Sequence, residues 1–379
     1  MFRYSYMDVI RLTLIVLSLM LAGCGRQSVS VTPSPEATAS PSPSPTRELD
    51  HPASKIDEIL ASLTEKEEFT GAVLVARNDD VLLSQGYGLA DRDKNIPNTP
   101  QTKYRLGSIT KEFTAAAILM LQAQNKLNVQ DLICIYIPEC PSIWQDITIH
   151  HLLTHTSGIP NITDFPDFQA FKATPSPPDQ TVERFKNKPL DFQSGERGSY
   201  SNSGYVLLGT IIEQASGQSY EAFLQQYIFE PVQMKNTGYD HNDGSLATGY
   251  TGFHANWETP DYLDMTIPFA AGGLYSTIED LYLWDQALYT EQLMSQESLN
   301  MMFTPQAMLS NLGMNYGYGW FIREVKNHLV ISHSGGIDGF ATEMRRYPDD
   351  KVTIIILSNR ETTEVITIGD GIALAVFGE

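Results

Sequence analysis

Residues 104–111 read Tyr-Arg-Leu-Gly-Ser-Ile-Thr-Lys, and the interpretation of the whole chain starts from them. Ser108 and Lys111 lie at the start of segment 108–125, whose apolar residues recur at helical spacing. Residues three apart on a helix project from the same face, so the hydroxyl and the amine can share a proton. A buried lysine can lose its charge and take the proton of a serine, which makes the serine a nucleophile. The alternative is that Ser108 only caps the helix.

Two polar segments further along the chain can complete a site around Ser108. Tyr200 and Asn202 lie in a Gly- and Ser-rich loop at 195–204, which turn formation alone would explain. The second segment follows the strand-like run 329–332. Its small residues would let a substrate backbone lie along the strand edge, while its histidine faces Ser108. The residues of this segment are His333, Ser334, Gly335 and Gly336.

The three elements, in this order, resemble the S-x-x-K, Y-x-N and K-T-G motifs of the penicillin-recognising enzymes. That family includes class C β-lactamases, penicillin-binding proteins and D-Ala-D-Ala carboxypeptidases. A histidine stands where the K-T-G motif has its lysine, as in the H-x-G branch of the family. The stretches 149–158 and 271–276 are also similar to the family, and the resemblance covers roughly residue 56 to the C-terminus.

The resemblance implies a role for each matched residue. Ser108 would attack a carbonyl carbon, and Lys111 and Tyr200 would move its proton. His333 would polarise the Tyr200 side of the site. The family needs no metal and no organic cofactor for this chemistry. The residues implied to contact the substrate or its oxyanion are Asn202, His333, Ser334, Gly335 and Gly336.

The expected fold is α/β, in the form of an α+β sandwich of the β-lactamase/transpeptidase kind. Runs rich in β-branched and aromatic residues lie at both ends of domain 51–379, and helical segments lie between them. One antiparallel sheet of N- and C-terminal strands, flanked by helices and carrying an inserted, mostly helical lobe at about 127–290, accounts for this pattern. The expected helices are 56–63, 108–125 and 364–377, and the expected strands are 71–76, 81–87, 316–323, 329–333, 340–347 and 352–359.

The N-terminus indicates export. Arginines precede an apolar run at 12–21 that is too short to span a bilayer, and the run ends in Leu-Ala-Gly-Cys. We therefore predict a lipoprotein-type signal peptide at 1–23, with Cys24 as the lipidated residue; an ordinary signal peptide or a short membrane anchor is the alternative. Residues 24–50, rich in Ser and Pro, would form an extended stalk. The predicted location is outside the cytoplasm, on a bacterial membrane, to which the acyl chains hold the protein.

Charge excludes one class of partner. The formal net charge of the 379 residues is −20, and no block of Lys and Arg interrupts it. Such a chain repels phosphates, so nucleic acid is not an expected partner.

Cysteine and histidine patterns raise two further possibilities. Cys134 and Cys140 could close a small loop through a disulfide in an oxidising compartment, or remain two buried thiols. His150, His151 and His155 raise a zinc site, because histidines at i and i+4 can share a ligand. We reject it, since no H-E-x-x-H pattern supplies an acidic base, and we expect no metal. Aromatics in the middle of the chain could line an acyl or leaving-group pocket, or belong to the core: Tyr250, Phe253, Trp257 and Tyr262.

The predicted activity is hydrolysis of ester or amide carbonyls in a small acyl substrate. A D-Ala-D-Ala carboxypeptidase or D-peptidase, or an esterase, fits the motifs best. A β-lactamase is an alternative, weakened because histidine at 333 is mostly neutral at pH 7 whereas lysine would bind the β-lactam carboxylate. A second class, a surface protein that binds a ligand without catalysis, remains open.

Overall fold

The computed structural model describes residues 52–378. The predicted signal peptide at 1–23, Cys24 and the predicted stalk at 24–50 lie outside the described residues. None of the helices between residues 52 and 378 is long and apolar enough to cross a bilayer.

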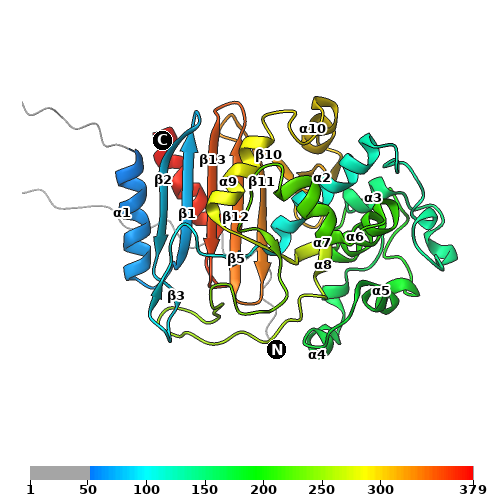
Figure 1. Cartoon of the computed structure of the whole chain (residues 1–379), viewed down its shortest axis with the longest axis horizontal. Coiled ribbons are helices and arrows are strands. Elements are labelled where there is room, and N and C mark those ends of the chain that lie inside the picture. Colours follow the sequence, from blue (N-terminus) through cyan, green and yellow to red (C-terminus); the bar gives the residue numbers. More distant parts are fainter. Residues whose placement is uncertain (1–51, 379) are drawn as a thin grey trace, which may run out of the picture. The chain divides into compact units, whose positions relative to one another are not determined.

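A large antiparallel sheet organises the domain, with strands from both ends of the chain (Figure 1). The strands are β1 (Gly71–Arg77), β2 (Asp80–Tyr87), β8 (Ala307–Leu309), β9 (Met314–Tyr316), β10 (Phe321–Val325), β11 (His328–Ile337), β12 (Phe340–Tyr347) and β13 (Val352–Ser358). They lie in the order β2-β1-β13-β12-β11-β10-β9-β8. Register is set by long antiparallel pairs, such as Gly71 opposite Ser358 and Arg77 opposite Val352. The predicted fold, an antiparallel sheet of terminal strands flanked by helices, is confirmed.

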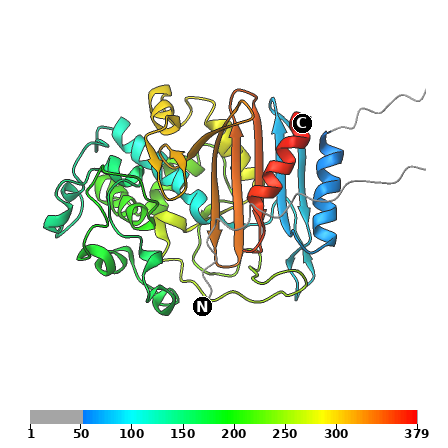
Figure 2. The same cartoon turned by 180° about the vertical axis from the view of Figure 1, so that it is seen from behind.

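Helices cover both faces of the sheet, and successive side chains of β1 point alternately toward the two helical layers. Ala72, Leu74 and Ala76 point into the larger core, which is shared with the helical lobe. Val73 and Val75 point into a second core on the opposite face. Because both faces are covered, the strand is apolar without interruption rather than alternating. The second core is closed by α1 (Pro52–Glu65) and α11 (Val365–Phe377), and Figure 2 shows α11 lying across that face of the sheet.

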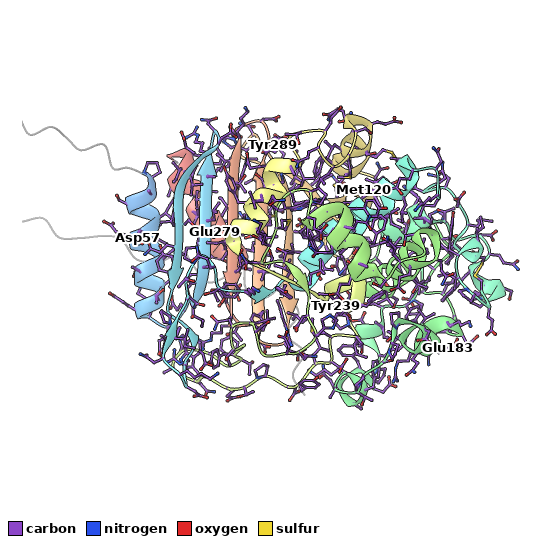
Figure 3. All side chains as sticks on the ribbon, in the orientation of Figure 1. Asp57, Met120, Glu183, Tyr239, Glu279 and Tyr289 are labelled. Atoms are coloured by element: carbon purple, nitrogen blue, oxygen red, sulfur yellow. A yellow bond between two sulfur atoms is a disulfide. The ribbon has the colours of Figure 1, made fainter. Side chains whose placement is uncertain are left out.

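The middle of the chain forms a mostly helical lobe around the central helix α2 (Thr110–Ala123). Every residue of α2 from 110 to 121 is buried, as expected of a helix enclosed on all sides. Figure 3 shows side chains filling the region around Met120 of α2. The surrounding helices are α3 (Ile149–Leu153), α4 (Phe168–Phe171), α5 (Pro178–Lys186), α6 (Asn202–Ser216), α7 (Tyr220–Leu224), α8 (Phe269–Gly272), α9 (Ile278–Ala287) and α10 (Gln296–Phe303).

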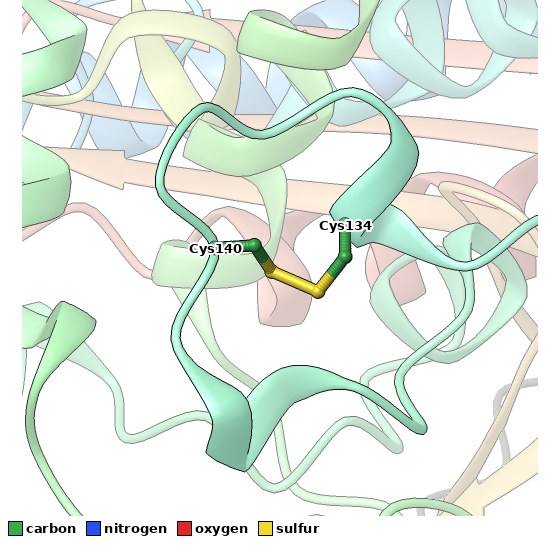
Figure 4. Close-up of a disulfide and its surroundings, with 2 residues drawn as sticks. All are labelled: Cys134 and Cys140. Carbon is green, nitrogen blue, oxygen red and sulfur yellow. A yellow bond between two sulfur atoms is a disulfide. The ribbon is translucent and has the colours of Figure 1, made fainter.

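Short strands form two small sheets apart from the large one, and a disulfide closes one loop of the lobe. The short strands are β3 (Leu89–Asp91), β4 (Ile96–Pro97), β5 (Tyr104–Arg105), β6 (Gly238–Tyr239) and β7 (Leu274–Ser276). Cys134 and Cys140 are joined by a disulfide, with their Cα atoms 5.2 Å apart (Figure 4). The small loop suggested by their spacing is therefore closed in the structure.

The structure differs from two of the predicted strands. The run 316–323 is interrupted, because β9 ends at Tyr316 and β10 begins at Phe321. Gly319, at a φ of +83°, forms part of the turn between them. The segment 333–336 was expected to follow a strand, but it lies inside β11 and pairs with β12.

Candidate active site

Ser108 lies in a tight turn that holds its hydroxyl at the base of the cleft. It belongs to the 3-10 turn η2 (Gly107–Ile109), which leads directly into α2. Gly107 adopts a φ of +54°, a left-handed conformation that favours glycine. Neither η2 nor α2 is capped by a side chain, and the Ser108 hydroxyl is bonded to Lys111 instead. The capping interpretation of Ser108 is therefore wrong.

Lys111 is fully buried and its amine has three polar neighbours. The Nζ atom lies 3.1 Å from Ser108 Oγ, 2.8 Å from Asn202 Oδ1 and 2.7 Å from the carbonyl oxygen of Ala271. Burial lowers the pKa of Lys111 well below its ordinary value, because no carboxylate compensates for the lost hydration. A neutral amine fits this geometry: two N–H bonds reach Asn202 and Ala271, and the nitrogen lone pair faces the Ser108 hydroxyl.

Tyr200 lies beside this pair. Lys111 Nζ is 4.9 Å from the centre of its ring. Burial raises the pKa of Tyr200, and a hydrogen bond with Ser108 partly offsets that rise. The side chain is therefore a neutral phenol in the free protein, able to donate its proton and to take one back.

His333 is buried, and both of its ring nitrogens are already bonded. Nδ1 lies 2.7 Å from the carbonyl oxygen of Ser334, which can only accept, so Nδ1 carries the proton. Nε2 then accepts from the hydroxyl of Tyr316 at 3.1 Å. Burial, with the nearby Lys111 amine, lowers the pKa of His333 to about 3, so the ring is neutral at pH 7. The expectation that His333 polarises the site directly needs correction, because its bonds go to Ser334 and Tyr316.

Two glycines of β11 allow the strand to lie against the nucleophile turn. A Cβ on Gly335 would stand 2.0 Å from the carbonyl oxygen of Leu106, so only glycine fits there. A Cβ on Gly336 would meet nothing within 4 Å. A Cβ on Gly107 would lie 3.1 Å from the Gly336 backbone nitrogen, which places that N–H beside Ser108. Ser334, half-buried, supplies the carbonyl that bonds His333.

Sequence reasoning missed two residues that support Tyr200. Tyr316 was assigned only to a strand, yet its hydroxyl bonds His333. His155 was considered as a zinc ligand and as part of the family-like stretch 149–158, but not as a neighbour of Tyr200; its buried ring lies 4.3 Å from the Tyr200 ring, centre to centre. The Nδ1 atom of His155 accepts the backbone N–H of Ser201, which anchors the loop that carries Tyr200. In the sequence, only the aromatic character of 316–320 could have indicated that Tyr316 belongs to the site.

The three histidines of the zinc hypothesis have separate roles. His150 Nδ1 bonds the Tyr318 hydroxyl at 2.7 Å, and His151 accepts the backbone N–H of Thr148 in a helix-capping pair. Within residues 52–378, no group of three or more His, Cys, Asp or Glu side chains is placed to hold a metal ion.

An apolar cavity of about 160 Å³ opens beside Ser108. Its wall is made by side chains from four separate segments: Ile162, Phe168, Val206, Leu263 and Ile267. None of the four aromatics considered for a pocket lines this cavity, and of the four only Tyr250 is buried. Trp257, for example, packs against the guanidinium groups of Arg92 and Arg360, whose Cζ atoms lie 4.0 and 4.1 Å from its ring centre.

The fold and the site together place the protein among the serine hydrolases that have a lysine beside the serine. A family model described as beta-lactamase matches residues 56–377, and the chain belongs to that family.

Individual relatives agree. A penicillin-binding protein of Bacillus subtilis (strain 168) is 33% identical over 327 residues, covering 81% of this chain and 71% of that protein. An octameric penicillin-binding protein homologue from Pyrococcus abyssi has a TM-score of 0.76 at 27% identity, over 86% of this chain and 77% of that one. A D-amino acid amidase from Ochrobactrum anthropi SV3 shares the fold, with a TM-score of 0.75 at 23% identity, over 86% and 98% of the two chains.

Proposed function

We propose that this protein cleaves ester and amide bonds through an acyl-enzyme on Ser108, acting on D-amino-acid peptides or amides, or on esters. The observation that carries the proposal is the position of the Lys111 amine. It is buried, its three hydrogen-bond partners include no carboxylate, and it faces the Ser108 hydroxyl at 3.1 Å. A neutral amine in that position is the base that a serine nucleophile needs.

Acylation follows from the geometry. As Ser108 Oγ attacks the carbonyl carbon, its proton passes to Lys111 Nζ. The oxyanion accepts hydrogen bonds from the backbone N–H groups of Ser108 and Gly336. The bond to the leaving group then breaks, and the leaving group takes a proton from Tyr200, which Lys111 reprotonates. The product is an ester of Ser108 with the acyl group.

Deacylation reverses the proton path. Water attacks the Ser108 ester while Tyr200 and Lys111 take up its proton, and Ser108 Oγ leaves with a proton returned from Lys111. Asn202 holds the amine throughout, because its Oδ1 bonds Nζ and its Nδ2 donates to Thr163 Oγ1 at 3.3 Å.

The names of the relatives support the substrate class. Two are penicillin-binding proteins or their homologues, and one with the same fold is a D-amino acid amidase. We expect β-lactam hydrolysis to be weak, because the ring of His333 is neutral and supplies no cation for the β-lactam carboxylate.

We also propose that Cys24 is lipidated after removal of residues 1–23, which places the enzyme outside the cytoplasm on a membrane. The sequence Leu-Ala-Gly-Cys supports this. Metabolic labelling with an alkyne fatty acid in a bacterial host should mark the wild-type protein and not Cys24→Ala. Equal labelling of both would remove the proposal.

The catalytic proposal is tested by labelling with a fluorophosphonate probe and mapping the modified peptide by mass spectrometry. Ser108 should be labelled, and Ser108→Ala and Lys111→Met should not react. Lys126→Met, at an exposed position, is the matched control and should react like the wild type. If the folded wild-type protein fails to react, the function is ligand binding without catalysis.

A further inference from the structure

The cavity beside Ser108 contains almost no charge. Among the described residues that line it, Asp338 is the only one with an ionisable side chain, and none is Lys or Arg. The rest of the lining is apolar or carries neutral polar groups such as Thr163 and Asn202. A substrate carboxylate entering this cavity would therefore need a cation from just outside the lining.

Lys172 is placed near the cavity but is already paired. Its side chain is only 5% exposed, and its Nζ is bonded to Asp338. A second carboxylate, Asp261, lies 3.7 Å from the same nitrogen. Two carboxylates thus share one ammonium group, and the negative charge of the cluster exceeds the positive.

The basic side chains of the two motifs that flank Ser108, Lys111 and His333, are also committed. The Lys111 amine has its three neighbours in Ser108, Asn202 and the Ala271 carbonyl. His333 donates from Nδ1 to Ser334, and its Nε2 is occupied by the Tyr316 hydroxyl. Neither side chain has an N–H left for a carboxylate.

We infer that the site selects esters and amides with an apolar acyl group and with no carboxylate adjacent to the scissile bond, so that D-Ala-D-Ala carboxypeptidase activity is disfavoured. This inference rests on the proposed hydrolase function and narrows its substrate class to neutral esters, amides and internal peptide bonds. A carboxylate here would lose its hydration without gaining a cation, and it would also meet the charge of Asp338. An apolar acyl group gains by leaving water for the wall of Ile162, Phe168 and Val206.

Two activated esters test the inference directly: the acetates of 4-nitrophenol and of 3-carboxy-4-nitrophenol. The scissile bond is the same and only the leaving-group carboxylate differs. After division by their rates with imidazole alone, kcat/KM for the neutral ester should exceed that for the carboxylated ester by about tenfold, the order expected of one unfavourable charge near a surface cleft. Equal values, or faster turnover of the carboxylated ester, would overturn the inference.

Asp338→Asn should shift this preference, because it leaves Lys172 with a weaker partner and frees it for a carboxylate. The ratio of the two kcat/KM values should move several-fold toward the carboxylated ester. Asp349→Asn removes the same charge at an exposed position beyond the far end of β12 and should leave the ratio unchanged. An identical ratio in Asp338→Asn and the wild type would contradict the role of the Lys172–Asp338 pair.

Fluorophosphonate labelling separates this inference from the function on which it rests. A labelled Ser108 with a preference for the carboxylated ester removes the inference and keeps the hydrolase. An unlabelled Ser108 with no turnover of either ester removes both.

Discussion

Replacing Lys111 with methionine tests the central claim that the buried amine is neutral. The two side chains have similar lengths, so the variant keeps the packing of α2 but has no titrating group. Burial lowers the pKa of Lys111 in the folded protein, whereas in the unfolded chain it returns to about 10.4. Below pH 10.4 the unfolded chain therefore binds a proton that the folded protein does not bind until the pH falls through the lower, folded pKa.

The size of the effect follows from proton linkage. While the unfolded state binds one more proton, this lysine makes the free energy of unfolding fall by about 1.36 kcal/mol for each unit of decreasing pH. Lys111→Met lacks this contribution. Between pH 9 and pH 7 its stability relative to wild type should therefore improve by up to about 2.7 kcal/mol, with the full value reached if the folded pKa lies below 7.

Urea unfolding of both proteins at several values between pH 7 and pH 9 measures this difference. Lys126→Met, in which the lysine replaced is exposed, is the control, and its stability relative to wild type should not vary with pH over this range. A difference for Lys111→Met that is constant with pH would mean that Lys111 keeps its proton in the folded protein. In that case it could not act as the base, and the proposed proton path would be refuted.

Three further predictions, the last of which compares two variants, have defined outcomes. Tyr200→Phe should lower kcat/KM for alkyl esters by about 10²–10⁴-fold. The loss should be much smaller for 4-nitrophenyl esters, because their leaving group needs no proton. Equal losses for the two kinds of ester would argue against proton donation by Tyr200. Tyr316→Phe leaves the buried Nε2 of the site histidine without a donor and should cost about 1–3 kcal/mol in urea unfolding, whereas an unchanged midpoint would contradict this bond. Gly335→Ala should fail to fold normally, because its Cβ would clash with the Leu106 carbonyl oxygen. Gly336→Ala should fold, because its Cβ meets nothing within 4 Å. Its methyl group would lie in the substrate path, so this variant should react slowly with fluorophosphonate. Comparable stability of the two alanine variants in thermal unfolding would contradict the close approach at 335.

Much of the architecture was predictable because the evidence for it is local. The S-x-x-K spacing at Ser108 depends on three consecutive peptide units. Uninterrupted apolar runs such as 354–357 indicate a strand covered on both faces. The order of the motifs along the chain indicated the family, and the family implied the fold.

The remaining features of the site depend on contacts between distant segments. The partner of His333 is Tyr316, on β9 rather than on a neighbouring strand, and no local pattern pairs them. The Ala271 carbonyl that binds Lys111 is a backbone atom and leaves no signature in residue type. The cavity wall combines four segments, at 162, 168, 206 and 263–267, which the chain brings together only on folding.

The position of β1 also limits the order in which this molecule can be made. It lies between β2 and β13, and the Ser358 hydroxyl bonds the Thr70 carbonyl across 288 residues of chain. During synthesis from the N-terminus, the β1 edge of the β1–β2 hairpin therefore stays unpaired until β13, near the end of the chain, has been made. The entropic cost of closing so long a loop then slows the pairing of β1 with β13. A chain cut before Val352 would lose the strand that joins the two parts of the sheet, so premature termination should yield an insoluble product rather than a partly active one.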